Sequence, residues 1–512
     1  MPSRDPGAAG PKAAVVMSAT GVTLSYDELI DHANRVADAL RSLGLRVGDG
    51  VAVLLENRPE WFEIVWATRR SGLYLTPVNT HLAQDEVDYI VRDSGARVVF
   101  VSPPLAHLVP EGAVEHVVIV GGDGTTGDGT TGDGALDYGA LLAAGSPQPV
   151  ISELPGSEMF YSSGTTGRPK GIKRPLASLD DAHPIVQSLS HARDLYGQTA
   201  DSVYLLPAPM YHAAPLVGGM TVHQTGGTVI LMAKFDAAEA LDAIERHRVT
   251  HAQFVPTMFV RMLRLPEHER YDVSSLQAVV HAAAPCPAPT KQAMLDWWGP
   301  VIHEYYNATE AFGGTRITPE EWLAHPGSVG QAPATLHVLD EHFDDVGPGV
   351  PGTIWFETQS KFEYHNDAAK TIANVSPQGY RTVGDIGYLD EDRYLFLTDR
   401  ATFMIVSGGV NIYPQEIEAA MIQHPGVGDV AVFGVPNAEF GEEVKAVVQP
   451  SDPAADHDVL RDELVEFCRA SLASYKQPRS IEFLDVLPRD PNGKLYKRRL
   501  RDGYWSGPSR IV

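Results

Sequence analysis

Apolar and polar positions follow two periodic patterns along the chain. In Tyr26–Leu43 the apolar residues recur every three or four positions, Ser25 and Glu28 form a capping-box pattern, and Gly44 follows. These features predict a helix, and Asp236–Arg246 has the same spacing. Shorter apolar runs predict buried strands at Val51–Leu55, Val98–Val101, Val117–Val120, Val203–Leu206 and Val229–Met232. Their alternation with helices predicts an α/β fold with substantially parallel sheets.

The length of the chain and a change in composition predict more than one domain. A chain of 512 residues is too long for one compact core. The segment Tyr380–Arg400, rich in Gly and Asp, is followed by a new α/β pattern. We therefore expect a large N-terminal domain of layered sheets and helices over residues 1–400, a boundary close to Ala401, and a small α+β domain over residues 401–512.

A tandem repeat of GDGTT lies within residues 121–134. It places Gly122, Gly124 and Gly127 in the spacing of a dinucleotide-binding loop, directly after an apolar run. No helical pattern opens at the third glycine, because the glycines simply continue, so a dinucleotide site is rejected. The repeat is interpreted as a flexible surface loop.

Charge and cysteine content exclude several classes of protein. The net charge of -25 argues against non-specific binding to nucleic acid or to an anionic membrane. Two cysteines, Cys286 and Cys468, exclude a disulfide scaffold and favour a reducing compartment. The N-terminus lacks the apolar run of a signal peptide, and no apolar stretch is long enough for a membrane span. We therefore expect a cytoplasmic protein.

Residues 161–171, YSSGTTGRPKG, are the most informative stretch. Glycines allow the backbone to approach a ligand closely, and backbone N–H groups in such a loop form a concavity that binds anions. The stretch lacks the Gly-x-x-x-x-Gly-Lys-[Ser/Thr] pattern of common ATPases, and Gly493-Lys494 fails it too because Leu495 follows. The expected ligand is a polyphosphate. The candidate residues are Ser162, Ser163, Gly164, Thr165, Thr166, Gly167 and Lys170.

Four further motifs follow this loop in order. They are YNATE at 306–310, YRTVGD at 380–385, the stretch 399–418 that contains SGGVNIYPQEIE, and PRDPNGK at 488–494. Together with the glycine loop, this set resembles the acyl-adenylate-forming superfamily, which includes acyl-CoA synthetases, carrier-linked adenylation domains and luciferases. The resemblance runs from about Thr23 to Arg501 and is to bacterial acyl-CoA synthetases in particular.

The resemblance implies a reaction in two steps. A carboxylate attacks the α-phosphorus of ATP to give acyl-AMP and pyrophosphate, and a thiol then displaces AMP. The glycine loop and Lys170 would hold the β- and γ-phosphates, Thr309 would contact phosphate, and Glu310 would hold Mg²⁺, which prefers oxygen ligands. The residues implied at the nucleoside are Tyr306, Asn307, Ala283 and Ala284 for adenine, and Asp385 and Arg400 for ribose.

The resemblance also implies that the C-terminal domain is mobile. Lys494 would be a catalytic lysine that bridges the attacking carboxylate and the α-phosphate, where one preorganised donor contributes about 3–4 kcal/mol. After a rigid-body rotation, Gly408 and Gly409 would face the site and admit the pantetheine arm of CoA. His212 would be a gate beside the carboxylate. The hinge position of the family is Thr402 here, where Asp or Lys is common, so hinge action at this residue stays open.

Taken singly, several of these residues have plainer interpretations. Glu310 alone fits a surface carboxylate, Asp385 a turn residue, and Lys494 part of a solvated basic tail. In register with the other motifs they are interpreted as functional. His247 and His251 lie four positions apart without an acidic general base between them, so they are interpreted as helix-end residues and not as metal ligands.

The acid-binding pocket is expected to be lined mainly by apolar or small side chains. No aspartate is present there to pair with an α-ammonium group, which favours an uncharged hydrophobic acid. Gly313-Gly314 would leave room for a long chain or a bulky ring. A medium- or long-chain fatty acid is favoured, and aryl, bile-acid-like and steroid-side-chain acids remain alternatives. The lining segments lie near Tyr211–Leu216, Val255–Met258, His281–Ala284 and Phe312–Thr315.

Free CoA is the expected acceptor, since no carrier domain follows the lysine motif. A fatty acyl-AMP ligase that loads a separate carrier protein is the nearest alternative, and a luciferase-type oxygenation is a more distant one. A catalytically idle acyl-binding protein is disfavoured because every expected reactive position is filled. The expected partners are the acid, ATP, Mg²⁺ and CoA, with no nucleic acid and no membrane span, and with a homodimer as one option.

Overall fold

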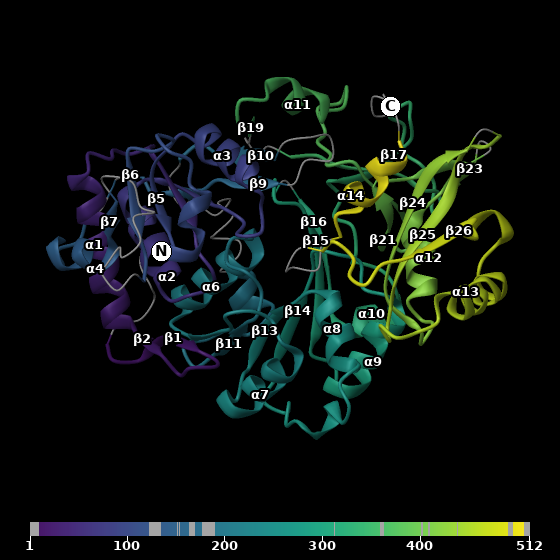
Figure 1. The fold of residues 1–512 in the computed structure, drawn as a ribbon, viewed down its shortest axis with the longest axis horizontal. Helices are drawn as coiled ribbons and strands as arrows, with labels where there is room; N and C mark the ends of the chain where they lie inside the picture. The colour runs from purple at the N-terminus through teal and green to yellow at the C-terminus, as the bar shows by residue number, and fades with distance from the viewer. Residues whose placement is uncertain are drawn as a thin grey trace. The chain divides into compact units, whose positions relative to one another are not determined.

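The computed structural model forms two compact units (Figure 1). Unit 1 comprises Met1–Ala282, Thr290–Phe312 and Gln359–Ala373, and unit 2 comprises Ala283–Pro289, Gly313–Thr358 and Asn374–Val512. The predicted boundary at Ala401 stays a prediction, because this residue lies outside the part of the chain that the structure describes. The described residues are 10–121, 135–150, 152, 154–162, 169–176, 190–311, 313–358, 363–400, 403–407, 410–437, 439–489 and 495–505.

The largest sheet of unit 1 is mainly parallel. From β11 to β15 a helix connects each strand to the next, as the alternation of apolar patterns predicted. In spatial order the strands are β15 (Ile302–Asn307), β14 (Ala278–His281), β13 (His251–Phe254), β11 (Val203–Leu206), β12 (Thr228–Leu231) and β1 (Ala13–Met17), with β2 (Thr23–Ser25) antiparallel to β1. The connecting helices are α6 (Ala213–Thr225), α7 (Ala237–His247), α8 (Pro256–Leu263) and α9 (Ala288–Trp298).

A second sheet of unit 1 is parallel throughout. The predicted strands at 51–55 and 117–120 are present but begin and end one residue earlier. In spatial order the strands are β7 (Leu136–Asp137), β6 (His116–Ile119), β5 (Ala96–Val101), β3 (Gly50–Leu54), β4 (Tyr74–Pro77) and β8 (Ser157–Glu158). Its helices are α1 (Tyr26–Ser42), α2 (Glu60–Ser71), α3 (Gln84–Asp93) and α4 (Tyr138–Ala144).

The two predicted helices begin where their caps place them. At α1 the Ser25 hydroxyl accepts from the backbone N–H of Glu28, whose carboxylate accepts in return from the Ser25 backbone N–H at 2.8 Å. At α7 the Asp236 carboxylate accepts from a backbone N–H of the first turn.

His247 ends α7 as predicted, but His251 begins β13, so the interpretation of His251 as a helix-end residue was wrong.

A small antiparallel sheet completes the described part of unit 1. Its strands are β9 (Phe160–Ser162), β10 (Lys170–Lys173) and β19 (Glu363–Tyr364), with β10 in the centre, and α11 (Ala368–Ala373) follows β19 (Figure 1). The predicted glycine loop connects β9 to β10, so this sheet decides where that loop starts and ends.

Unit 2 contains an antiparallel sheet and a separate C-terminal layer. The sheet has the spatial order β17 (Leu336–Leu339), β18 (Gly352–Phe356), β20 (Asp385–Leu389) and β21 (Leu395–Arg400). Strand β16 (Gly314–Ile317) and helix α10 (Pro319–Ala324) also belong to this unit.

Residues 405–501 form an α+β layer within unit 2. Apolar residues between Ile405 and Ile481 make a core of their own, which includes Cys468. Lys497 is not part of a solvated tail, because it is only 8% exposed and lies 2.8 Å from a carboxylate oxygen of Glu418. The elements are β22 (Ile405–Ser407), β23 (Val410–Ile412), α12 (Pro414–Met421), β24 (Val427–Asn437), β25 (Gly441–Pro450), α13 (His457–Ser471), β26 (Ser480–Phe483) and α14 (Lys497–Arg501).

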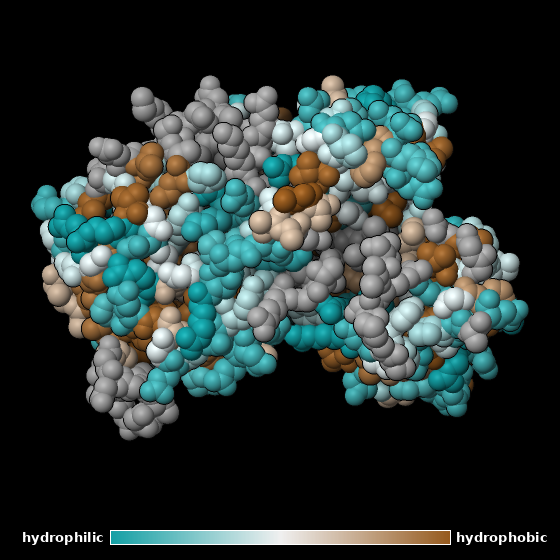
Figure 2. Space-filling view, turned by 90° about the horizontal axis from the view of Figure 1, so that it is seen from above, coloured by the Kyte–Doolittle hydropathy of each residue, from teal (hydrophilic) through white to brown (hydrophobic). Residues whose placement is uncertain are grey.

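The described surface is mixed in polarity. Figure 2 shows hydrophilic residues interspersed with smaller apolar areas in that view. Every helix in the described ranges is too short or too polar to span a bilayer.

Candidate functional site

Several segments predicted to bind substrate lie at one edge of the large parallel sheet of unit 1 (Figure 1). Strands β11, β13, β14 and β15 are neighbours and run parallel, so their carboxyl ends meet at the same edge. In open parallel sheets ligands bind beyond the carboxyl ends of the strands. The segments at this edge are the loop to His212 after β11, Val255–Met258 after β13, His281–Ala282 at the end of β14 and Ala308–Glu310 after β15.

A buried asparagine fixes the loop between β11 and His212. The Asn57 amide donates to the backbone oxygens of Ala208 at 3.0 Å and Met232 at 2.9 Å. Its side-chain oxygen accepts from the backbone N–H of Met210 at 2.8 Å. The loop delivers a half-buried His212 to the start of α6. Sequence analysis did not identify Asn57, because its carbonyl partners are 151 and 175 residues away in the chain.

The predicted metal ligand Glu310 lies in a turn directly after β15. Its side chain is buried, and its Oε1 accepts a hydrogen bond of 2.7 Å from the hydroxyl of Tyr364 on β19. The preceding backbone oxygen, that of Thr309, accepts a hydrogen bond of 2.7 Å from the Arg174 guanidinium. Ala311 has φ 51°, a left-handed conformation that costs free energy for residues other than glycine. The turn is therefore held in one specific shape.

The antiparallel sheet β9–β10–β19 supplies the basic groups beside this turn. The ammonium group of Lys170 lies 5.7 Å from the centre of the Tyr364 ring. Burial lowers the pKa of the Arg174 guanidinium, and the carboxylates of Glu158 and Glu310 oppose that shift. Lys170 pairs with Ser162 across β9 and β10. The other predicted loop residues, Ser163, Gly164, Thr165, Thr166 and Gly167, lie outside the described residues.

A buried charged cluster joins the end of β14 to the middle of β15 and to α9. The parallel register places His281 beside Glu304, whose Oε2 lies 3.3 Å from the His281 Nε2 and 2.6 Å from the Lys291 Nζ. Burial lowers the pKa of the His281 imidazole, although the Glu304 carboxylate opposes that shift. Burial opposes the charge of Glu304, but His281 and Lys291 outweigh it and lower the pKa of this carboxyl group. The cluster therefore links the end of β14 to β15 and α9.

The residues predicted at adenine are divided between the two units. In unit 1, Tyr306 is buried within β15, and Asn307 is exposed at its end, where its Oδ1 accepts from the Ala308 N–H at 2.7 Å. In unit 2, Ala283 has φ 73°, and Ala284 follows it. This strained backbone conformation is a common feature of ligand-binding segments, which fits a role for the backbone of this segment.

Unit 2 carries the two residues predicted at the ribose. Asp385 begins β20, Arg400 ends β21, and the antiparallel register pairs them directly. Gly313, which was expected to leave room for the acid, has another structural reason: a Cβ atom there would lie 2.3 Å from the Phe356 ring. Packing inside unit 2 therefore already requires glycine at this position.

The residues predicted for catalysis and CoA binding in the C-terminal layer, Lys494, Gly408 and Gly409, lie outside the described residues. The chain on either side of the lysine motif is fixed, because Arg489 and Leu495 pair in an antiparallel bridge. The Arg489 guanidinium also donates two hydrogen bonds to the Asp429 carboxylate. Sequence analysis missed Asp429, because nothing in its local sequence indicates this partner.

The turn after β15 offers one carboxylate, that of Glu310, as a metal ligand. This fits a magnesium ion whose other ligands are mainly nucleotide phosphates. Proteins hold Mg²⁺ through one or two carboxylates plus substrate phosphates. Glu310 supplies one carboxylate, and Lys170 on β10 supplies positive charge beside Tyr364, the hydrogen-bond partner of Glu310. Within the described ranges no group of three or more His, Cys, Asp or Glu side chains is arranged to hold a metal ion.

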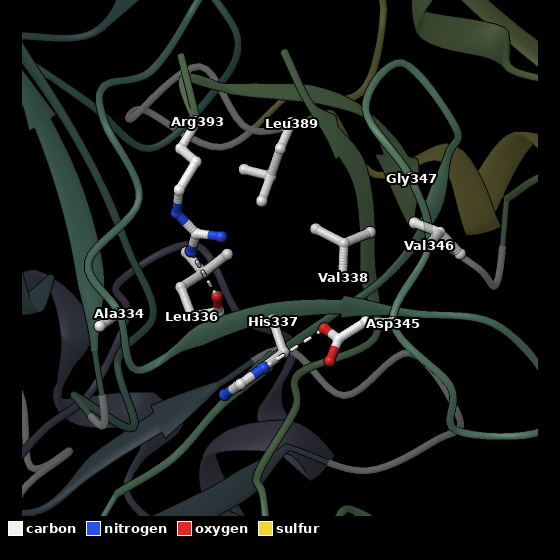
Figure 3. Close-up of a pocket in the computed structure, with 9 residues that line it drawn as sticks. All are labelled: Ala334, Leu336, His337, Val338, Asp345, Val346, Gly347, Leu389 and Arg393. Atoms are coloured by element: carbon white, nitrogen blue, oxygen red, sulfur yellow. Dashed lines mark hydrogen bonds and ion pairs between the residues drawn. The ribbon is translucent and has the colours of Figure 1, made fainter. Parts of the chain in front are cut away.

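A hollow of about 360 Å³ lies within unit 2, away from the predicted residues (Figure 3). It is formed by β17 and the loop that follows, with Leu389 and Arg393. On its wall, Nδ1 of His337 lies 3.3 Å from a carboxylate oxygen of Asp345. None of the lining residues belongs to the predicted site.

Comparison with known proteins agrees with this geometry. Residues 5–363 match the family model of the AMP-binding enzyme, and residues 416–494 match that of the AMP-binding enzyme C-terminal domain. The chain is 32% identical to the long-chain-fatty-acid–CoA ligase FadD13 of Mycobacterium tuberculosis, over 96% of this chain and 95% of that one. It is 34% identical to a feruloyl-CoA synthase of Amycolatopsis sp, over 94% of each chain. The solved structure of ATP-bound MatB from Rhodopseudomonas palustris superposes with a TM-score of 0.81, at 29% identity, over 98% of this chain and 96% of that one.

The family models and these relatives define an enzyme that activates carboxylic acids as adenylates, and the chain belongs to the AMP-binding enzyme family. It is an acyl-CoA synthetase of the acyl-adenylate-forming superfamily, which makes it an acid–thiol ligase. The predicted α/β fold is confirmed.

Proposed function

We propose that this ligase activates a hydrophobic carboxylic acid, with a medium- or long-chain fatty acid favoured, and transfers the acyl group to free CoA. The observation that carries the proposal is the shared edge of β11, β13, β14 and β15. Apart from Glu310, the segments at this edge contain no acidic residue. Leu216, Val255 and Met258 are buried apolar residues. An α-ammonium group would lack a partner among them.

The first step would join the acid to AMP. A carboxylate oxygen of the acid attacks the α-phosphorus, the bond from this phosphorus to the bridging oxygen breaks, and pyrophosphate leaves. Lys170 and the glycine loop would hold the leaving phosphates, while Lys494 would bridge the carboxylate and the α-phosphate. Glu310 would hold Mg²⁺, which when bound neutralises phosphate charge, and Thr309 would contact phosphate. Asp385 and Arg400, paired across β20 and β21, would bind the ribose.

The second step would follow rotation of a C-terminal domain that begins near residue 401. The sulfur of CoA attacks the acyl carbon, the bond to the AMP oxygen breaks, and AMP leaves. Gly408 and Gly409 would admit the pantetheine arm, and His212 would move away from the acyl carbon. The rigid flanks of Lys494, set by the Arg489–Asp429 pair, would carry that lysine into and out of the site as one body.

An aryl acid is the second candidate, since a feruloyl-CoA synthase is similar to this chain to nearly the same degree as a fatty-acid ligase. The test is incubation with ATP, Mg²⁺ and a panel of fatty and aryl acids, with and without CoA. Release of pyrophosphate and AMP is measured, and the thioester is identified by mass. Fatty acids should give the highest kcat/KM, whereas a preference for aryl acids would overturn the chain-length assignment. Pyrophosphate release without any CoA thioester would favour transfer to a carrier protein instead.

A further inference from the structure

Two residues outside the predicted set converge on the turn that carries Glu310. Tyr364 reaches it from β19, and Arg174 reaches it from the end of β10. Both strands belong to the small antiparallel sheet, which pairs Tyr364 with Ile172. The sheet that starts and ends the glycine loop therefore also holds the turn after β15.

Their contacts differ in kind and act on different atoms. The Tyr364 hydroxyl donates to Oε1 of Glu310, and its side chain is 5% exposed. The Arg174 guanidinium donates to the backbone oxygen of Thr309, and its charge attracts the Glu310 carboxylate. One contact therefore orients the carboxylate, and the other fixes the backbone that carries it.

We propose that Tyr364 and Arg174 are positioning residues, which present the Glu310 carboxylate to a divalent cation on the nucleotide phosphates. The inference rests on the proposed role of Glu310 as a metal ligand. A carboxylate has lone pairs on both oxygens, so a hydrogen bond to Oε1 leaves Oε2 available to the cation. Partners that orient a ligating carboxylate typically contribute 10–100-fold to metal affinity.

The test uses the full-length protein and separates metal affinity from nucleotide affinity. Calorimetry measures ATP binding in EDTA, and a Mg²⁺ titration then measures metal binding to the ATP complex. Tyr364→Phe removes only the hydroxyl group. It should weaken Mg²⁺ binding about 10–100-fold, leave ATP binding in EDTA within about twofold, and raise the Mg²⁺ concentration for half-maximal adenylation by a similar factor. Mn²⁺, which binds most ligand sets more tightly than Mg²⁺, should reduce the deficit.

Tyr138→Phe is the matched control. Tyr138 is also 5% exposed, and its hydroxyl also donates to a buried carboxylate, that of Glu63, at 2.5 Å. It should lose comparable thermal stability without a change in Mg²⁺ affinity. Arg174→Met, which keeps an unbranched apolar stem but removes the charge and the donor, should weaken Mg²⁺ binding in the same direction as Tyr364→Phe.

The outcomes separate this inference from the proposed function. Equal Mg²⁺ affinity in wild type and Tyr364→Phe, or an equal loss in Tyr138→Phe, would overturn the positioning role while leaving the ligase reaction intact. Failure of the wild-type protein to form an adenylate from any acid would overturn the proposed function, and the Mg²⁺ titration of its ATP complex would still decide the role of Tyr364. A wild-type ATP complex that binds no Mg²⁺ would overturn the inference.

Discussion

His223 is a fully buried histidine whose two ring nitrogens have opposite hydrogen-bonding roles. The indole N–H of Trp66 donates to Nδ1 at 3.2 Å, and Nε2 lies 3.1 Å from the backbone oxygen of Ala14. The neutral ring with its proton on Nε2 satisfies both partners. A second proton on Nδ1 would face the indole N–H. Burial accordingly lowers the pKa of His223 to about 4.

This pKa predicts a loss of stability in mild acid. The unfolded chain binds a proton at His223 near pH 6.5 but the folded chain only near 4, so folding is disfavoured as the pH falls between these values. The expected contribution is a loss of about 2 kcal/mol at about pH 5. His223→Gln, which keeps a donor and an acceptor but does not titrate, should lose less stability than wild type between about pH 7.5 and 5. Equal shifts in the thermal midpoint would contradict the assignment.

A second prediction for a single residue concerns Lys494, which is proposed to act in only the first of the two half-reactions. Lys494→Ala should reduce acyl-AMP formation about 10²–10³-fold, since a preorganised donor at the developing charge is lost. Formation of the thioester from supplied acyl-AMP should be spared. Pyrophosphate release and thioester formation are measured separately in single turnovers. Equal loss of both steps would exclude the role proposed for this residue.

At the scale of elements, local signals predicted the helices and strands well but not the contacts that hold the site. Ser25 and Glu28 are three residues apart, so the capping box could be recognised from sequence. The partners of Glu310 and Asn57 come from other elements, and no local pattern marks them. The interpretation of His251 was wrong because a spacing of four residues fits a helix. The helix α7 ends at His247, and β13 begins at His251.

The loop between β11 and α6 depends on one side chain from another element. Asn57→Ala would leave two backbone oxygens and one N–H in a buried region without their partner. We expect a loss of about 2–4 kcal/mol in stability, and a higher KM for the acid because the segment before His212 loses its support. Thermal unfolding and initial rates test both effects.

Asn34→Ala is the control for this element. Asn34 is also buried. It donates to the backbone oxygen of Pro147 at 2.8 Å and accepts from the Arg70 guanidinium, and neither partner lies at the carboxyl edge of the large sheet. It should destabilise the protein without changing the KM for the acid. A rise in KM in both variants would show that the effect of Asn57 is only a general loss of stability.

At the scale of the whole molecule, the predicted residues are distributed over two compact units. Lys170, His212, Tyr306, Thr309 and Glu310 belong to unit 1. The residues predicted at the ribose and in the C-terminal layer belong to unit 2. Motif order along the chain predicted the set of residues. It contained no information on this division, because each unit is assembled from three segments that alternate with those of the other unit along the chain.

The proposed rotation can be tested at the position two residues after Arg400. Proline fixes φ near −65°, so Thr402→Pro should slow a rotation that requires a backbone change there. We expect a normal burst of pyrophosphate in a single turnover and a steady-state rate of acyl-CoA formation reduced about tenfold or more. Thr402→Ala serves as the control and should turn over like wild type. An unchanged steady-state rate in Thr402→Pro would place the hinge at another residue.

The parallel strands of unit 1 end together, and the connections that leave them are the parts of this unit that meet the acid in the proposed reaction. The framework and the selectivity of the enzyme are thereby encoded in separate stretches of the polypeptide. Substitutions in the few positions after β11 and β13 can retune which acid is accepted while the buried strands are inherited unchanged. Such an arrangement makes a new specificity accessible to evolution, or to a small combinatorial library, without rebuilding the scaffold.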